Sequence, residues 1–486
     1  MTDRGGTDAA SQEMPAAPAA PPAGLALLLL LAMAQFMVVL DFTIVNVALP
    51  SIQRDLHVAT TTLQWLISGY AVSFSGFLLL GGRLADVYGR ARLFRIGLVV
   101  FVVASISGGL AVEPGLLIAS RVAQGAGAAL LAPAGLALLV TSWPGQKERS
   151  RALGTYGAVV SAGFASGAVL GGLLVEATWR LVFFVNVPVG LALLIASFRL
   201  LPPDSRRGGR QVDVPGAVTA TAGVGLLVLA IVRAGDTLRV TQPLVLAVVA
   251  VALLAAFVIR ERRAREPLLD LALLKDRGIA GANLTMVTYG ALNAAQVLLL
   301  TLYLQDGLGL SALYTGLCFI PQAAGAFALS GPAGRFVPVL GLRRTLTIAL
   351  ALALLALFGS AASVLAGSLA GLLVAQFAIG VSARLSQVAS TLAGTRGPVA
   401  ERSEGTASAL LTASRQAGSA LGVAIASAVL VAAHGSVAHR TATAIVSGIC
   451  FAVLGLLTSQ IVPSGKPHPE TSRPEHAFTH HAGGMP

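Results

Sequence analysis

The fold follows from the stretch Leu40-Asp41-Phe42-Thr43-Ile44-Val45-Asn46-Val47-Ala48-Leu49-Pro50. It closes an apolar run that begins near Leu25 and is long enough to cross a bilayer. An aspartate in the middle of such a span costs roughly 3 kcal/mol to insert. Asp41 must therefore face a protein interior or a wet cavity, or be protonated for part of its working life. It is the first candidate functional residue.

The composition of the 486-residue chain is that of a polytopic membrane protein. Hydrophobic residues make up 55% and charged residues only 11%, whereas a soluble protein carries about 25% charged residues. The net charge of +12 does not indicate a nucleic-acid partner, because the basic residues form short clusters between apolar spans, without base-stacking aromatics. Cys318 and Cys450 lie inside apolar runs, so we expect no disulfide, no metal site and no cofactor.

Fourteen apolar segments are long enough to span a membrane, and they predict an all-α integral membrane protein. Their approximate limits are 25–50, 61–81, 93–112, 114–140, 152–174, 181–201, 213–233, 242–260, 279–304, 311–332, 343–362, 364–386, 405–431 and 441–462. With the N-terminus in the cytoplasm, most Arg and Lys residues fall in cytoplasmic loops, as the positive-inside rule requires. The sequence therefore predicts a multi-pass protein of the cytoplasmic membrane with both termini cytoplasmic.

An internal repeat suggests two six-helix bundles with two inserted, peripheral helices between them. The loop Gly82–Arg92 after the second span has a degraded echo, Gly334–Arg344, at the matching place in the last six spans. The expected segments are an N-terminal bundle, a hinge with two inserted helices and a basic loop, a C-terminal bundle, and two disordered cytoplasmic tails: 24–201, 202–278, 279–462, 1–23 and 463–486.

Two charges of opposite sign are predicted to lie at one depth. Arg121 lies about eight residues into the fourth span and Asp41 about nine residues from the outer end of the first. At ~1.5 Å per residue both are about 12–13 Å below the outer surface, so a contact is plausible. Burial raises the pKa of an aspartate and a nearby arginine lowers it, and a balance would allow proton coupling. The alternative is a permanent ion pair that only fixes helix packing.

Other polar residues inside the spans are candidates for lining a cavity. Arg415 has no acid inside the spans of its own half, so either a cavity role or a packing role is open. The amides can line a cavity or join helices by hydrogen bonds. They are Gln35, Asn46, Gln124, Asn283, Asn293, Gln296 and Gln376.

Taken together, these segments resemble the major facilitator superfamily, and specifically its fourteen-helix drug–proton antiporter branch. The resemblance covers the first-helix stretch, the Gly82–Arg92 loop, Arg121–Ala129, the helix-five stretch Gly163–Gly172 and Trp179–Pro188. Two positions depart from the pattern. Val87 stands where a basic residue is often found, and Ala168 where a proline is usual.

The resemblance implies roles for particular residues. Asp41 would be the protonation site and Arg121 its modulating partner. A cytoplasmic gating loop would latch the two halves together through Gly82, Arg83, Asp86, Gly89 and Arg90. The glycines of the antiporter motif would form the pliable interface where the halves rock: Gly163, Gly167, Gly171 and Gly172.

The sequence thus predicts a proton-driven, alternating-access exporter of hydrophobic or amphiphilic drugs or antibiotics, expected to be a monomer with small molecules, protons and the lipid bilayer as partners. A narrow natural-product or metabolite exporter and a proton-coupled importer of the same fold remain alternatives. An enzyme is not expected, because the histidines form no cluster inside the spans and no nucleophile with a base is evident at the membrane face.

Overall fold

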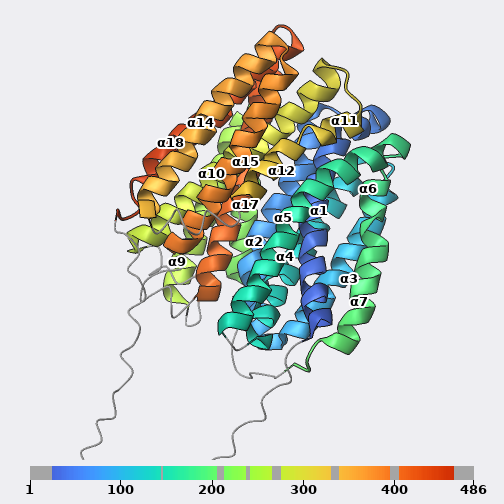
Figure 1. Cartoon of the computed structure of the whole chain (residues 1–486), viewed down its shortest axis with the longest axis vertical. Helices are drawn as coiled ribbons and strands as arrows, with labels where there is room; N and C mark the ends of the chain where they lie inside the picture. The colour runs from blue at the N-terminus through green and yellow to red at the C-terminus, as the bar shows by residue number, and fades with distance from the viewer. Residues whose placement is uncertain are drawn as a thin grey trace, which may run out of the picture.

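The computed structural model describes residues 24–143, 146–204, 213–236, 241–264, 275–329, 339–394 and 404–464, and all statements below concern these residues. The expected tails, apart from residues 463 and 464, lie outside them, as do 205–212 of the hinge, 265–274 of the basic loop and 330–338 of the repeated loop. The described residues are helical and contain no strand. The helices run side by side in a thick bundle (Figure 1).

The first half of the chain forms one group of helices. They are α1 (Leu25–Leu56), α2 (Thr60–Tyr88), α3 (Arg90–Gly109), α4 (Pro114–Ser142), α5 (Gln146–Ala177), α6 (Leu181–Phe184) and α7 (Asn186–Leu200). α1 continues past Pro50 to Leu56, beyond the predicted span. The added residues include Arg54 and Asp55, whose exposed side chains suit a helix end in water. The predicted sixth span consists of two helices, because the helix is interrupted at Val185.

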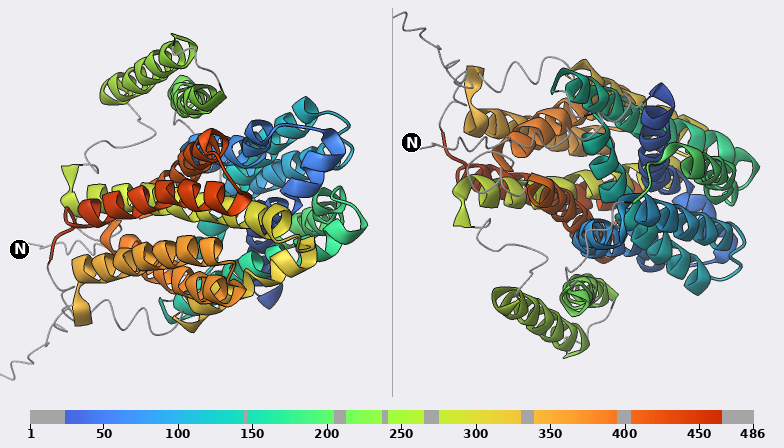
Figure 2. Two further views of the ribbon diagram at one scale, coloured as in Figure 1. Left: turned by 90° about the horizontal axis from the view of Figure 1, so that it is seen from above. Right: turned by 90° about the horizontal axis from the view of Figure 1, so that it is seen from below.

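The second half forms a matching group on the other side of the bundle (Figures 1 and 2). Its elements are α10 (Arg277–Leu302), the π-helix η2 (Tyr303–Gly307), α11 (Ala312–Leu317), α12 (Ile320–Ala328), α14 (Leu342–Ala366), α15 (Leu369–Gly394), α17 (Glu404–Ala432) and α18 (Val437–Ser459). The predicted tenth span is again two helices, α11 and α12, separated at Cys318 and Phe319.

Two inserted helices, α8 (Val214–Asp236) and α9 (Thr241–Arg263), form a hairpin outside the two groups. The Arg260 guanidinium donates to both oxygens of Asp213, at 2.7 and 3.0 Å, and ties the ends of the hairpin together. α9 is largely exposed. α8 packs against both α2 and α17, so this inserted helix bridges the two halves, whereas α9 lies at the periphery.

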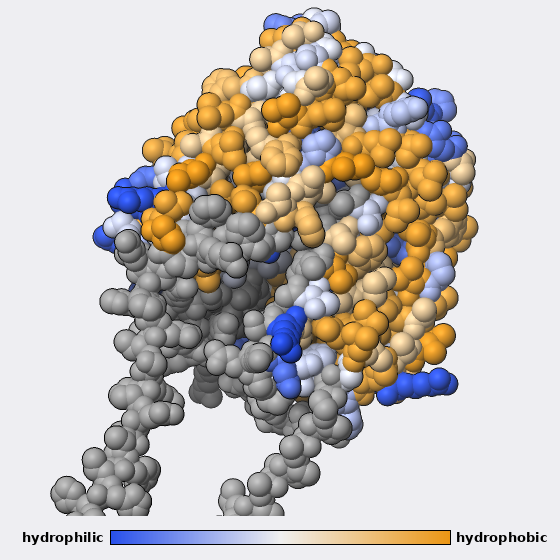
Figure 3. Space-filling model, in the orientation of Figure 1, coloured by the Kyte–Doolittle hydropathy of each residue, from blue (hydrophilic) through white to orange (hydrophobic). Residues whose placement is uncertain are grey.

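The outer surface suits a bilayer. Ten helices are long and apolar enough to cross a membrane, and shorter apolar helices occupy Ser166–Ala177, Val218–Ile231 and Ala312–Ala328. Each of the fourteen predicted spans coincides with one helix or with two consecutive ones. On the face seen in Figure 3, the coloured surface is mostly apolar, and the most hydrophilic residues lie toward its edges. These features indicate a multi-pass membrane protein.

Several close contacts between the two halves lie near one end of the bundle. We call the end at which α1 begins the terminal end and the end with the α1–α2 loop the opposite end. Gln305 of η2 donates to the Val47 carbonyl at 2.9 Å, and Ser68 of α2 donates to the Ala420 carbonyl at 3.3 Å. A Cβ at Gly172 of α5 would lie 2.5 Å from the Cα of Leu313 in α11. These contacts all lie in the part of the bundle nearer the opposite end.

Candidate functional site

Asp41 and Arg121 form an ion pair inside the first group of helices. Asp41 belongs to α1 and Arg121 to α4, and both side chains are fully buried. The Arg121 guanidinium donates to Asp41 Oδ2 at 2.6 Å. The equal depth deduced from the sequence therefore corresponds to a direct contact. A charge pair this deeply buried is tolerated only when its hydrogen-bonding capacity is well satisfied.

Two amides complete the surroundings of the Asp41 carboxylate. Its Oδ1 atom accepts hydrogen bonds from Gln124 Nε2 at 3.0 Å and from Asn186 Nδ2 at 2.8 Å. Gln124 lies one turn after Arg121 on α4, and Asn186 is the first residue of α7, placed there by the break at Val185. The carboxylate thus joins α1, α4 and α7.

The Arg121 guanidinium is held on its other sides as well. Its Nε donates to the Leu66 carbonyl of α2 at 2.9 Å, and a terminal nitrogen donates to Gln124 Oε1 at 2.8 Å. The guanidinium carbon lies 4.4 Å from the centre of the Tyr70 ring, a cation–π contact. Gln124 also donates to Ser105 of α3 at 2.8 Å. The network therefore reaches five helices.

Asn186 was missed by the sequence analysis as a site residue, although the stretch that contains it was noted. The signal that points to it is an amide directly after five apolar residues, Leu181-Val182-Phe183-Phe184-Val185, within a predicted span. Its Oδ1 atom and the Tyr70 hydroxyl are buried without a hydrogen-bond partner among the described residues. The network thus keeps one spare acceptor, on Asn186, and one spare hydroxyl.

The glycines of α5 let this helix approach its neighbours closely. A Cβ at Gly167 would lie 1.8 Å from Thr43 Oγ1, and Gly163 and Gly171 are packed against other parts of α1. Gly172 faces α11 of the second half instead. One helix therefore contacts both the helix that carries Asp41 and the other half of the molecule.

The predicted gating loop is fastened within the first half. Gly89 has a φ of +100°, and a Cβ there would lie 2.3 Å from the Asp204 carboxyl carbon. The Asp204 carboxylate accepts from the backbone N–H groups of Ala91 and Arg92, at 2.8 and 3.0 Å, at the N-terminus of α3. Arg90 donates to Thr141 of α4 at 3.3 Å.

Asp204 was not predicted as part of this loop. Its only sequence signal is an acid directly after Pro202-Pro203 at the end of the sixth span. Gly82 and Arg83 lie in the last turns of α2, both half-buried. The side chain of Asp86 lies outside the described part of the structure.

The remaining candidates fall into three places. Gln35 is half-exposed on α1, and Asn46 donates to the Phe42 carbonyl of the same helix at 2.8 Å. On α10, Gln296 is hydrogen-bonded to Gln376 of α15, and Asn293 accepts from Gln322 of α12 at 3.0 Å. Asn283 of α10 accepts from Ser414 at 2.8 Å, next to the half-buried Arg415 of α17.

Known proteins resemble this chain along most of its length. It is 39% identical over 453 residues to a puromycin resistance protein of Streptomyces alboniger, and the aligned region covers 88% of each chain. It is 36% identical over 408 residues to a multidrug resistance protein of Mycobacterium tuberculosis, covering 82% of this chain and 74% of that one. It is 43% identical over 303 residues to a cephamycin export protein of Amycolatopsis lactamdurans, covering 61% and 62%.

Solved structures share the fold at low sequence identity. A peptide transporter in complex with sulfate superposes with a TM-score of 0.65 at 16% identity, covering 92% of this chain and 98% of that one. A bacterial homolog of the human lysosomal transporter Spinster gives 0.63 at 13% identity, covering 91% and 98%. The sequence profile of the Major Facilitator Superfamily matches residues 31–423. The two groups of helices, the resistance and export proteins among its relatives and this match have one explanation: the chain belongs to the Major Facilitator Superfamily.

Proposed function

We propose that the protein is a proton-coupled antiporter that exports hydrophobic or amphiphilic drugs or antibiotics across the cytoplasmic membrane by alternating access. The observation that carries the proposal is the Asp41 carboxylate, fully buried in the first half and bound by Arg121. Intramembrane acids of this kind are costly and are characteristic of proton and substrate pathways. Relatives named for antibiotic resistance or export support drugs as the exported class.

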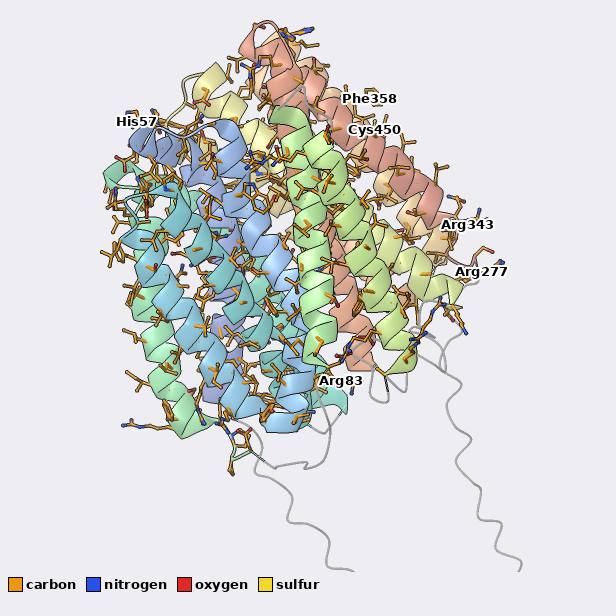
Figure 4. The ribbon with its side chains drawn as sticks, turned by 180° about the vertical axis from the view of Figure 1, so that it is seen from behind. His57, Arg83, Arg277, Arg343, Phe358 and Cys450 are labelled. Atoms are coloured by element: carbon orange, nitrogen blue, oxygen red, sulfur yellow. The ribbon has the colours of Figure 1, made fainter. Side chains whose placement is uncertain are left out.

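The orientation supports an exporter whose termini are cytoplasmic. Arg83, Arg277 and Arg343 lie toward the terminal end of the bundle and His57 at the opposite end (Figure 4). By the positive-inside rule the terminal end then faces the cytoplasm. The hydrogen bonds between the halves lie toward the outer side in this orientation. We infer that the structure corresponds to the state that is open to the cytoplasm.

The proton acts by changing what the carboxylate can bind. Ionised Asp41 accepts hydrogen bonds from Arg121, Gln124 and Asn186. A proton arriving from outside neutralises the carboxylate and converts one oxygen from an acceptor into a donor. The hold on Arg121 or on a bound cation weakens, the drug leaves, the halves rock and the proton exits inward.

α5 is the element that transmits this change in our scheme. Gly167 is packed on Thr43, two residues from Asp41 in α1, while Gly172 of the same helix is packed on α11. A small shift of α1 therefore acts on a helix that contacts the second half. The tight glycine contacts let α5 slide along its neighbours without large side chains in the way.

Asp41 is the carboxylate buried in the middle of a span among the described residues, and one such group sets the expected stoichiometry at about one proton per cycle. A monocation would then be exchanged without net charge movement, and a neutral substrate would move one charge. Proton-to-substrate ratios in proteoliposomes clearly above one would refute this stoichiometry.

The decisive test uses everted vesicles from a pump-deficient host and a compound panel that includes puromycin. Antiport predicts that an exported compound dissipates the pH gradient on addition. Asp41→Asn should abolish this response and uphill transport, a loss of about 100-fold or more, because the neutral amide cannot exchange a proton. Asp55→Asn is the matched control on the same helix, since Asp55 is exposed and paired with Arg180.

Three outcomes would contradict the proposal. An Asp41→Asn protein that still pumps against a gradient would assign coupling to another residue. Loss of activity in Asp55→Asn as well would make the effect unspecific. Movement of substrate together with the proton, rather than against it, would identify an importer.

A further inference from the structure

Arg415 is a cation at membrane depth in a half that has no acid at that depth. It lies eleven residues after Glu404, the first residue of α17, which is about 16 Å along the helix axis. Between residues 279 and 462 the sequence has three acids, of which Asp306 lies in η2, Glu404 is the first residue of α17, and Glu401 lies outside the described residues. Among the carboxylates that the structure describes in the second half, none therefore balances Arg415 inside the membrane.

The guanidinium of Arg415 has no protein partner of its own in the described part of the chain. Arg121, Arg180 and Arg260 are paired with aspartates, whereas no ion pair or side-chain hydrogen bond of Arg415 is found among the described residues. Its side chain is half-buried. An arginine at this depth is stabilised by a counter-charge or by water in an interior space.

A second donor without a partner lies beside it. The Tyr289 hydroxyl of α10 is buried and makes no hydrogen bond to any described residue. α10 and α17 are in close contact at this level, since a Cβ at Gly290 would lie 2.1 Å from the Arg415 carbonyl oxygen. Ser419 fixes the contact by donating to the Gly290 carbonyl at 3.3 Å. Tyr289 therefore directly precedes the residue of α10 that is packed against the Arg415 backbone.

The helical register turns Arg415 away from lipid. Ser419 follows it by one turn on the same side of α17 and is buried, as are Gln416 and Val423 next to that side. Leu421 and Ala428, which are partly exposed, lie on a different side of the helix. The exposed part of Arg415 therefore faces the interior side of α17 rather than the bilayer.

We propose that Arg415 and Tyr289 form an anion-binding subsite that takes the carboxylate of an exported amphiphile. A guanidinium binds a carboxylate through two parallel hydrogen bonds, and the tyrosine hydroxyl adds a third donor. The subsite lies about 16 Å from the cytoplasmic start of α17, too deep for the headgroup of a lipid in the bilayer. The assignment rests on the proposed export function and names its substrate class.

The subsite changes the charge balance of transport. One proton entering while one monoanion leaves moves two charges in the same direction across the membrane. Export of a carboxylate is then driven by the membrane potential as well as by the pH gradient. In contrast, the exchange of a monocation would be independent of the potential.

Equilibrium binding to the full-length protein in detergent tests the subsite. The probes are 1-pyrenebutyrate and its neutral amide, which share an apolar body and differ in charge. The wild type should bind the acid at least 10-fold more tightly than the amide. Arg415→Gln should reduce the affinity for the acid by about 10- to 100-fold, to that for the amide, because a hydrogen-bonded charge pair is lost.

Two further variants separate the subsite from general effects. Tyr289→Phe should weaken binding of the acid by about 3- to 10-fold and leave the amide unchanged, because one hydrogen bond is lost. Arg384→Gln removes the same charge from α15, where Arg384 is also half-buried, and should keep the preference for the acid.

Several results would overturn the subsite. They are equal or undetectable binding of the acid by the wild type, retention of the preference in Arg415→Gln, or its loss in Arg384→Gln. Binding is measured without a proton gradient, so it is independent of Asp41. Failure of gradient-driven export with an intact preference for the acid would instead contradict the antiport mechanism alone.

Discussion

Arg121 and Arg415 are both arginines at membrane depth, but their surroundings differ. Arg121 in the first half is fully buried and bonded to Asp41, Gln124 and the Leu66 carbonyl, with Tyr70 against its face. Arg415 in the second half is half-buried and lacks a protein counter-charge among the described residues. The charge of Arg121 is neutralised by a protein carboxylate, whereas in our proposal the charge of Arg415 is neutralised by a bound ligand. The two halves thus divide proton handling from substrate recognition in our proposal.

The largest expected difference concerns stability. Arg121→Gln should lower the free energy of unfolding by about 3–5 kcal/mol, because it leaves the buried Asp41 charge unpaired. Arg415→Gln should change it by less than ~1 kcal/mol, because no protein partner is lost. Reversible unfolding in mixed micelles measures both. Equal losses would show that Arg415 is also a structural charge.

A double variant of Arg121→Gln and Asp41→Asn refines this comparison. Its loss in free energy of unfolding should be smaller than the sum of the losses of the two single variants, by about 0.5–3 kcal/mol, because neither charge then remains unpaired. In the corresponding double-mutant cycle of Arg415→Gln and Asp41→Asn, the changes in the free energy of unfolding should be additive within about 0.5 kcal/mol. Coupling in the second cycle would mean that the two halves share one charge network.

A substitution of Asn186 tests how much the amide hydrogen bonds contribute to stabilising the Asp41 carboxylate. Asn186→Ala should destabilise the protein by about 1.5–3 kcal/mol, because a hydrogen bond to a charged acceptor is lost. The matched control is Asn46→Ala, whose amide bonds only to its own helix. Similar losses of stability in both variants would show that Asn186 makes no special contribution to the Asp41 site.

Another expected effect concerns the packing of α5 behind Asp41. Gly167→Ala should cost about 1–3 kcal/mol, because its methyl group meets Thr43 in a closely packed contact. Gly115→Ala is the control, since its Cβ would meet no atom within 4 Å. The gradient-driven transport of Gly167→Ala should fall more than its binding of 1-pyrenebutyrate, which depends on the second half. An equal fall in both would contradict this division of labour.

The sequence analysis predicted what depends on the helical rise and on the cost of burying charge. Counting residues from the ends of two spans placed Asp41 and Arg121 at one level, and they are in contact. Gln124 was predicted only as a cavity residue, yet it bonds to both. Such pairing depends on the rotation of one helix against another, which the apolar pattern of a span does not specify.

The breaks in the helices were not predicted. An apolar run predicts that a segment crosses the membrane but not where its hydrogen-bond ladder is interrupted. The break at Val185 places Asn186 beside Asp41, and the π-helix at Tyr303–Gly307 contains Gln305, which bonds to Val47. The capping of α3 by Asp204 joins residues more than a hundred positions apart, and no local pattern encodes it.

The position of α8 has a consequence for engineering a shorter protein. Val228 of this helix lies in one apolar cluster with Ala71 of α2 and Ala420 and Ala424 of α17. Gly76 of α2 receives the Thr221 side chain so closely that a Cβ there would lie 2.2 Å from its hydroxyl oxygen. Deleting the hairpin would leave a strip of small residues against acyl chains, which fill such notches poorly. A twelve-helix derivative would therefore need larger side chains along α2 and α17 before it could be expressed intact.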